Sequence, residues 1–368
     1  MPSFFREARL APGIWEPCWC EMIPINPQQV LDRLLTLGGQ IRSSIVHSRR
    51  GPELGSVQRD SAADTIYKLD TIVEPLLEEF FRDWSRTTPL VLIAEGIEGN
   101  TGQEGVKVFP NGTEVQNALL RVIVDPVDGT RGLMYDKRSA WFLIGVAPNK
   151  GEGTRLRDIE IAAMTELPTS KMGWADVLWA MKGRGAHGQR IDLRTLMAKP
   201  LTIQPSSAVN IDHGFASVAN FFPATKVLAS ELMEFIVENL IGAADVTRAV
   251  VFDDQYISTG GQFYELMMGR DRFNTDLRPL FYEIQKKAVG LCCHPYDCAA
   301  MLVAQEAGVQ LTDGLGDPLD GPLDVTTPIS WAGYANSCLR GVIEPLLIKF
   351  IRAKGIHGKA ENGPRHTL

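Results

Sequence analysis

The chain has 368 residues with a formal net charge of −7, and it is 45% hydrophobic and 22% charged. This length fits one large domain or two tightly joined ones, and the composition is ordinary for a globular protein. The negative net charge gives no indication of a basic surface, so we expect neither a nucleic acid nor an anionic membrane as a partner.

The hydrophobic segments are too short to cross a membrane, because a spanning helix needs about 20 apolar residues. The longest ones, 90–94 and 141–147, have the length of strands. The first 22 residues include charged side chains such as Arg6 and Glu7 and lack a continuous apolar stretch, so we expect no signal peptide. The six cysteines follow neither a zinc-site spacing nor a disulfide scaffold, which favours buried thiols in a cytoplasmic protein.

Periodic hydrophobic side chains predict two helices first and then a strand-rich region. The first helix is expected after Asn26-Pro27, with the asparagine as N-cap, and the second over about residues 62–84. Strands are then predicted at 90–94, 119–124, 141–147, 159–164 and 177–181. Further helices are predicted at 227–240, 298–307 and 342–352. This order of elements favours a layered α/β or α+β fold.

We place a boundary between two halves of the chain near residues 199–205. An N-terminal α+β half would cover residues 26–200, and a C-terminal α/β half would cover residues 201–354. Residues 355–368 are polar and contain glycine, and we expect them to form a frayed tail.

The strongest local motif is RVIVDPVDGT at residues 121–130. A β-branched strand leads to Asp125, and Asp128 follows three residues later on a tight turn. Two such carboxylates can point at a single cation, and carboxylate and carbonyl oxygens are the ligands that Mg²⁺ prefers. Asp128 can also cap the next helix, which would turn the N–H groups of Gly129 and Thr130 towards a phosphate oxygen. A capped turn without any ligand is the alternative.

Two further acids that could join this motif belong to other segments. Glu95 follows the strand predicted at 90–94, and ligands gather at the carboxyl ends of strands in open sheets. Asp297 stands at the start of the helix predicted at 298–307. Alone, Glu95 is explained as well by a solvated loop acid, and Asp297 by a helix N-cap. Both become candidate metal ligands only together with Asp125 and Asp128.

With these residues the chain resembles the inositol monophosphatase-like superfamily, which includes fructose-1,6-bisphosphatases and bisphosphate nucleotidases. Residues 125–130 match the signature DPxDGT, and residues 297–300 with 306–308 match the second signature, WDxAA…EAGG. A weaker match lies at 179–191, and the resemblance spans about residues 66–347. It implies a layered αβαβα sugar-phosphatase fold.

The resemblance also implies roles for individual residues. Two or three Mg²⁺ ions would be held by oxygen ligands from Glu95, Asp125, the backbone carbonyl of Val127, Asp128 and Asp297. Thr130 and Asp70 would orient the attacking water. Asp70 fits a plain solvated helix face equally well, because Glu74 and Glu78 share that face.

This chain departs from the family pattern in three places. Gly96 stands where the family usually has a second consecutive acid, and Glu98 is the candidate catalytic residue to replace it. Tyr296 replaces the tryptophan of the second signature, and we expect the nearby His294 to be structural. Inositol-specific members of the family carry an acid that contacts the ring hydroxyls, and this chain has no acid at the corresponding residues 288–290. This absence weakens the prediction that the substrate is inositol phosphate itself.

Together the motifs favour a Mg²⁺-dependent phosphomonoesterase that hydrolyses a small phosphorylated polyol or sugar with metal-activated water. A 3'(2'),5'-bisphosphate nucleotidase or a sugar bisphosphatase is the alternative within this class, and a non-catalytic metal- or phosphoester-binding relative is the alternative outside it. Substrate contacts are expected at about residues 255–287, where Arg270, Arg272 or Arg278 could meet a second phosphate. The expected partner is a small phosphorylated substrate, and a homodimer is compatible with the resemblance.

Overall fold

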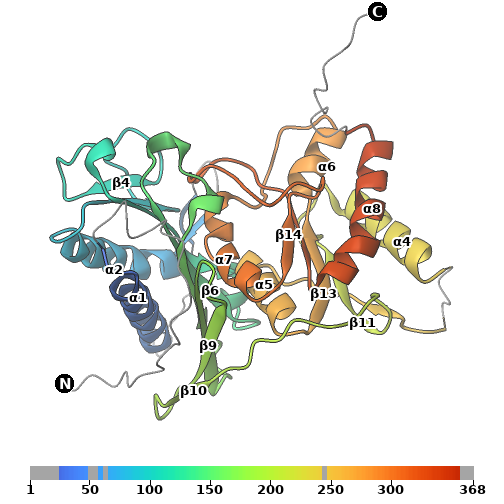
Figure 1. Cartoon of the computed structure of the whole chain (residues 1–368), viewed down its shortest axis with the longest axis horizontal. Coiled ribbons are helices and arrows are strands. Elements are labelled where there is room, and N and C mark those ends of the chain that lie inside the picture. The colour runs from blue at the N-terminus through green and yellow to red at the C-terminus, as the bar shows by residue number, and fades with distance from the viewer. Residues whose placement is uncertain (1–24, 49–56, 61–64, 243–246, 357–368) are drawn as a thin grey trace, which may run out of the picture.

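The computed structural model describes residues 25–48, 57–60, 65–242 and 247–356, without the side chains of 57–60 and 65–71. Its helices and sheets alternate in five layers (Figure 1). From left to right in Figure 1 these are a helical layer, a large sheet, an inner helical layer, a smaller sheet and an outer helical layer. The layered αβαβα fold predicted from the sequence is therefore confirmed.

The first layer consists of α1 (Pro27–Ser48) and α2 (Lys68–Trp84), which pack on one face of the large sheet. Asn26 caps α1 as predicted, because its side-chain oxygen accepts a 2.9 Å hydrogen bond from the Gln28 N–H. Helix α2 begins later than the predicted residue 62. The reason is that β2 (Thr65–Tyr67) comes before it and pairs with β1 (Val57–Asp60).

The large sheet has eight strands in the order β10-β9-β8-β7-β6-β5-β3-β4, and all neighbours are antiparallel except β3 and β5. β5, β6 and β7 are buried at every position, as expected for strands that helices cover on both faces. The five strands predicted from the sequence overlap β3, β5, β6, β7 and β8. The strands are β3 (Leu90–Ala94), β4 (Val106–Phe109), β5 (Leu120–Asp128), β6 (Ala140–Pro148), β7 (Ile161–Leu167), β8 (Trp174–Met181), β9 (Ala186–Asp192) and β10 (Ala198–Pro200).

The second sheet has five strands in the order β12-β11-β13-β15-β14. Helices α5 (Thr259–Met267) and α7 (Met301–Glu306) fill the layer between the sheets, since each packs on strands of both. Helices α4 (Lys226–Leu240) and α8 (Ser337–Ala353) form the outer layer. The remaining elements are β11 (Gly214–Val218), β12 (Val251–Phe252), β13 (Asp271–Asp276), α6 (Arg278–Ile284), β14 (Gln310–Thr312) and β15 (Trp331–Tyr334).

The two halves predicted from the sequence share a core in this arrangement. The large sheet is built from residues 90–200 and the second sheet from residues 214–334. The inner helices come from the second half but pack on the large sheet of the first. The geometry between the halves is therefore set by close packing of the inner layer rather than by a linker.

The helix predicted at 298–307 is divided in the structure. The 3₁₀ helix η4 (Pro295–Cys298) comes first, and α7 begins at Met301. Pro295 lies in the first turn of η4, where its missing N–H costs no hydrogen bond. Asp297 therefore sits within a short turn of its own and not in front of a long helix.

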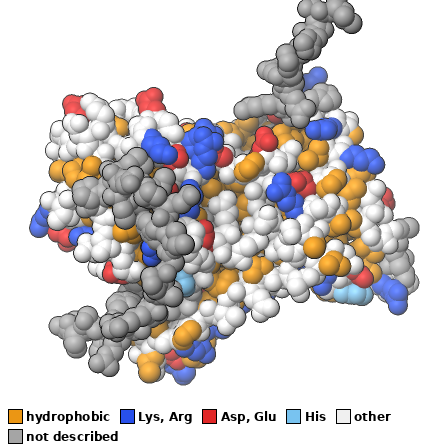
Figure 2. Space-filling view, in the orientation of Figure 1, with side chains coloured by type: hydrophobic (Ala, Val, Ile, Leu, Met, Phe, Trp, Pro, Cys, Tyr) orange, Lys and Arg blue, Asp and Glu red, His pale blue; other side chains and the backbone are white. Residues whose placement is uncertain are grey.

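The coloured part of the surface in Figure 2 carries interspersed Lys or Arg and Asp or Glu side chains, without a large area of one charge sign. Exposed large hydrophobic side chains include Tyr135, Leu196 and Met197. Within residues 25–48, 65–242 and 247–356, no helix is both long and apolar enough to cross a membrane.

Gly145 in β6 allows the segment after η4 to lie directly against the large sheet. A Cβ on Gly145 would lie 2.4 Å from the Ala299 carbonyl oxygen and 2.8 Å from Ile159 Cδ1, so alanine does not fit without a shift. We expect Gly145→Ala to lower the free energy of unfolding by roughly 1–3 kcal/mol, measured by urea denaturation. Gly173→Ala is the control, because a Cβ there meets no atom within 4 Å. An equal loss in both variants would contradict this account.

Candidate active site

Three of the acids predicted as metal ligands lie at one edge of the large sheet. β3 and β5 run parallel, so their carboxyl ends meet at the same edge. Glu95 directly follows β3, and Asp125 and Asp128 lie in the last part of β5. The parallel pairing of two strands that are neighbours in the sheet thus brings these segments together.

A β-bulge in β5 turns Asp125 and Asp128 to the same side. Asp125 lies opposite Leu143 of β6 and Asp128 lies opposite Trp141, so three steps along β5 match two steps along β6. Side chains alternate along a regular strand, and residues three apart would point to opposite faces. Pro126, which has no N–H to offer the ladder, lies inside the bulge. The bulge is what allows one strand to supply two carboxylates to one site.

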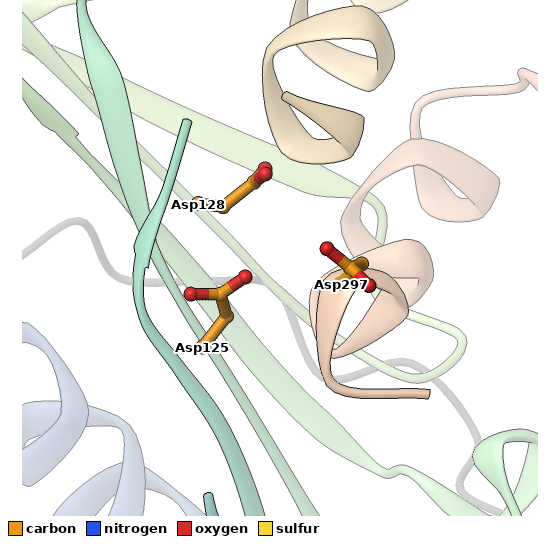
Figure 3. Close-up of side chains that lie close together, drawn as sticks. All are labelled: Asp125, Asp128 and Asp297. Carbon is orange, nitrogen blue, oxygen red and sulfur yellow. The ribbon is translucent and has the colours of Figure 1, made fainter. Parts of the chain in front are cut away.

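The third carboxylate of the cluster, Asp297, comes from η4 in the C-terminal half. Oxygens of Asp125, Asp128 and Asp297 all lie within 4.8 Å of one another, and Figure 3 shows the three carboxylates around a shared space. Asp125 and Asp128 are only 3% and 5% exposed, whereas Asp297 is half-buried. The His294 N–H donates a 2.6 Å hydrogen bond to Asp297 and holds it in place. We call these three residues the acidic cluster.

Asp128 also contacts the N-terminus of α5 in the inner helical layer. Its carboxylate accepts hydrogen bonds from the Ser258 hydroxyl at 2.8 Å and from the backbone N–H groups of Thr259 at 3.2 Å and Gly260 at 2.6 Å. A helix N-terminus carries a partial positive charge, which stabilises a carboxylate at this position. Asp128 therefore connects the acidic cluster to the inner layer.

The turn after Asp128 leads into the short helix α3 (Thr130–Met134). The expectation that Asp128 caps this helix is wrong, because Gly129 is its N-cap residue, with a φ of 98° that suits glycine. A Cβ on Gly129 would lie 3.0 Å from Ser258 Cβ, so glycine also allows the segment before α5 to approach. The Thr130 hydroxyl donates to the Val127 carbonyl at 2.7 Å, which links two of the predicted site residues.

These groups line a cavity of about 530 Å³, a usual size for a small-molecule site. It receives side chains from both halves of the chain, so it lies where the halves meet. The predicted site residues that line it are Glu95, Asp125, Val127, Asp128, Gly129, Thr130 and Asp297.

The structure does not bring Glu98 or Arg270 to this cavity. Glu98 is exposed and is not among the lining residues. Arg270 is directed elsewhere, since its guanidinium donates to Glu265 at 2.9 Å and packs on the Tyr264 ring. The side chain of Asp70, on α2, falls outside the described residues.

Of the three arginines considered for a second phosphate, Arg278 is the one that lines the cavity. Arg272 donates to the Asn210 carbonyl at 3.2 Å and has a structural role there. The three arginines look alike in the sequence, and only their partners in the folded chain distinguish them.

Glu74 and Tyr296 also line the cavity beside the predicted acids, but the sequence predicts no role for either residue. Glu74 of α2 faces the space beside Gly96, where a Cβ would lie 3.4 Å from Glu74 Oε1. Tyr296 is buried, and burial together with the charges of Asp297 and Glu95 raises the pKa of its hydroxyl well above the ordinary value. The four-residue spacing of Glu74 from Asp70 on one helix face is the signal that could have found it.

Comparisons with known proteins identify the fold. No family model matches the chain, and no curated protein sequence matches it at a significant level. The crystal structure of fructose-1,6-bisphosphatase from Leishmania major matches with a TM-score of 0.63 and 15% identity, over 90% of this chain and 96% of that one. This chain has the inositol monophosphatase/fructose-1,6-bisphosphatase fold.

Two further structures of this fold come from bacteria. An IMPase of Thermotoga maritima has a TM-score of 0.57 and 14% identity, over 89% of this chain and 100% of that one. Inositol monophosphatase II of Staphylococcus aureus has a TM-score of 0.57 and 13% identity, over 88% and 96%. The resemblance first seen in the two signatures is thus confirmed at the level of the fold.

Within this inositol monophosphatase-type fold, the carboxylates of the acidic cluster oppose one another's ionisation. Burial and the nearby charges of Asp128 and Asp297 raise the pKa of Asp125 well above its usual range. Burial raises the pKa of Asp128 to about 7, although hydrogen bonds from the start of α5 act in the opposite direction. Burial and the charge of Asp128 likewise raise the pKa of Asp297. Clustered oxygen donors that carry an uncompensated charge fit a hard divalent cation such as Mg²⁺.

Metal-free protein should lose stability as the pH rises. An acid whose pKa is raised by folding binds its proton more tightly in the folded chain than in the unfolded chain. Below the pKa of the unfolded chain, about 4, this difference does not change the free energy of unfolding. As the pH rises from there towards the pKa of the folded chain, which is about 7 for Asp128, the free energy of unfolding falls.

Asp125→Asn tests this electrostatic account. The variant removes one buried charge and keeps the oxygen that accepts the Val127 N–H at 3.0 Å. In EDTA at pH 8 we expect its Tm to exceed that of the wild type by about 2–4 °C, and the difference to shrink towards pH 5. Added Mg²⁺ should raise the Tm of the wild type only. Glu98→Gln, an exposed acid, is the control, and an Asp125→Asn variant less stable than the wild type at pH 8 would contradict us.

Proposed function

We propose that this protein is a Mg²⁺-dependent phosphomonoesterase that acts on a small phosphate ester of the polyol or sugar class. The observation that carries the proposal is the acidic cluster, which faces a cavity beside Thr130 and Val127. The fold supports it, since structures that share this fold include an inositol monophosphatase and a fructose-1,6-bisphosphatase. The names of both proteins denote hydrolysis of a phosphate ester.

In this proposal the acidic cluster holds Mg²⁺ together with Glu95 and the Val127 carbonyl. Bound there, Mg²⁺ would acidify a water molecule and offset the negative charge of the phosphoryl group and of the leaving oxygen. Thr130 donates its hydroxyl proton to Val127, so its lone pairs can accept a hydrogen bond from the attacking water. Asp70 is the second residue that we propose to orient this water. The N–H groups of Gly129 and Thr130 would support a phosphate oxygen.

Asp297→Asn should lower kcat with Mg²⁺ by about 100-fold or more, because the variant removes a ligand charge and keeps the shape of the side chain. The measurement is phosphate release from a panel of sugar, inositol and nucleotide phosphates, with Mg²⁺ and with EDTA. Asp83→Asn, an exposed acid on α2, is the matched control. Full activity of Asp297→Asn would refute the site. Metal binding without turnover of any ester would instead favour the non-catalytic alternative.

Glu74 is the carboxylate that we propose in place of the second acid missing at Gly96. It enters the space beside Gly96 from α2, whereas Glu98 is exposed. We expect Glu74→Gln to lower kcat by about 10- to 100-fold, in the range of a lost acid–base group, and Glu98→Gln to stay within about twofold of the wild type. The reverse order of effects in a steady-state assay would assign the role to Glu98.

A further inference from the structure

One part of the cavity wall is aromatic and cationic. Phe221 and Phe222, in the loop between β11 and α4, lie there with Arg131 of α3 and Arg278 of α6. Among the described residues that line the cavity, Arg131 and Arg278 are the only Lys or Arg residues. We call the four residues the Phe–Arg wall.

Both arginines of the Phe–Arg wall pack on phenylalanine rings. The guanidinium carbon of Arg131 lies 5.3 Å from the centroid of the Phe222 ring, and that of Arg278 lies 5.2 Å from the same centroid and 4.8 Å from that of Phe221. The two rings meet edge to face with centroids 5.2 Å apart. Arg278 is itself fixed, since it is 5% exposed and paired with Asp276. These contacts hold the half-buried Phe222 ring in a defined position.

The Phe222 ring is connected through the Arg131 side chain to the turn that we assign to the phosphate. Arg131, which packs on this ring, directly follows Thr130 in α3. Thr130 and the acidic cluster line the same cavity as the ring. A phosphate ester bound at the acidic cluster would therefore extend its leaving group along the Phe–Arg wall.

The Phe–Arg wall offers this leaving group no side-chain acceptor for hydroxyl groups, because two of its side chains are phenylalanines and the other two are arginines, of which Arg278 is already paired with Asp276. Elsewhere in the C-terminal half, the Ser258 hydroxyl already donates to Asp128, and the other polar lining residues besides Arg278 are Thr259, Cys292, His294, Tyr296, Asp297 and Thr326. An acyclic polyol needs donors and acceptors there, because unpaired hydroxyls are costly to bury. An aromatic ring needs a flat apolar surface instead. Besides the two phenylalanines, the apolar lining residues of this half include Ile257, Leu291 and Val325.

We propose that Phe222 determines substrate specificity by stacking on an aromatic ring carried by the leaving group. Arg131 and Arg278 act as positioning residues that hold the Phe222 ring. This inference rests on the proposed function and narrows its substrate to phosphate esters that bear a flat aromatic ring on or beside the phosphorylated unit. Stacking of this kind changes affinity by about 5- to 150-fold.

The test compares phenyl phosphate with glycerol 2-phosphate, because the aromatic ring is present only in the first ester. We expect Phe222→Ala to lower kcat/KM for phenyl phosphate at least about fivefold, mainly through KM, and to change that for glycerol 2-phosphate by less than about twofold. Phe222→Tyr keeps the ring and should retain the phenyl phosphate value. Phe215→Ala, an exposed phenylalanine on β11 outside the cavity lining, is the control. Equal losses for both esters, or no loss for either, overturn the proposal.

A binding measurement separates this inference from the proposed function. If the wild type hydrolyses neither ester, calorimetric titration of each ester in the presence of Ca²⁺ decides about Phe222. The proposed function fails only if the panel of sugar, inositol and nucleotide phosphates also releases no phosphate. Tighter binding of phenyl phosphate by the wild type, lost in Phe222→Ala, supports the role of the ring. Equal affinities of the wild type for the two esters overturn it.

Discussion

The site depends on holding several carboxylates together where water is largely excluded. Asp125 and Asp128 are almost fully buried beside Asp297, and each charge makes ionisation of the others less favourable. Hydrogen bonds from the start of α5 and from His294 offset only part of this cost. In the proposed enzyme a bound cation supplies the remaining compensation. Metal affinity and folding stability are then coupled through the same charges.

The same cluster makes the chemistry sensitive to the packing between the two halves. Asp125 and Asp128 belong to the large sheet, and Asp297 belongs to a segment packed against it. Gly260 shows how close this packing is, since a Cβ there would lie 3.0 Å from Asp128 Oδ2 and 2.5 Å from Leu143 Cδ2. A shift of one half against the other would change the distances among the ligands directly. A tightly packed inner layer is thus a condition for a defined site and not merely a source of stability.

The sequence could predict those features that depend on neighbours along the chain. The two signatures located Asp125, Asp128 and Asp297, and the order of helices and strands indicated the layered fold. The bulge was not predictable, because it depends on the register between β5 and β6. The contact of Asp128 with Ser258 joins residues 130 positions apart, so no local pattern records it. Glu98 could be proposed from its closeness to Gly96 along the chain, whereas the approach of Glu74 to Gly96 depends on how α2 packs, which no local pattern records.

The carboxylates of the site and the two phenylalanines of the Phe–Arg wall come from different segments of the chain. This separation explains how a site of this kind can keep its chemistry while its substrate changes. The carboxylates that would hold the metal come from β5, η4 and the end of β3, whose positions are fixed by the large sheet and the inner layer. Phe221 and Phe222 stand in a loop that contributes none of these carboxylates, and Phe222 contacts the Arg131 side chain of α3. Substitutions in this loop can therefore alter which leaving group fits without disturbing the acidic cluster. In the proposed enzyme, separate parts of the chain would thus recognise the reacting phosphate and the rest of the substrate.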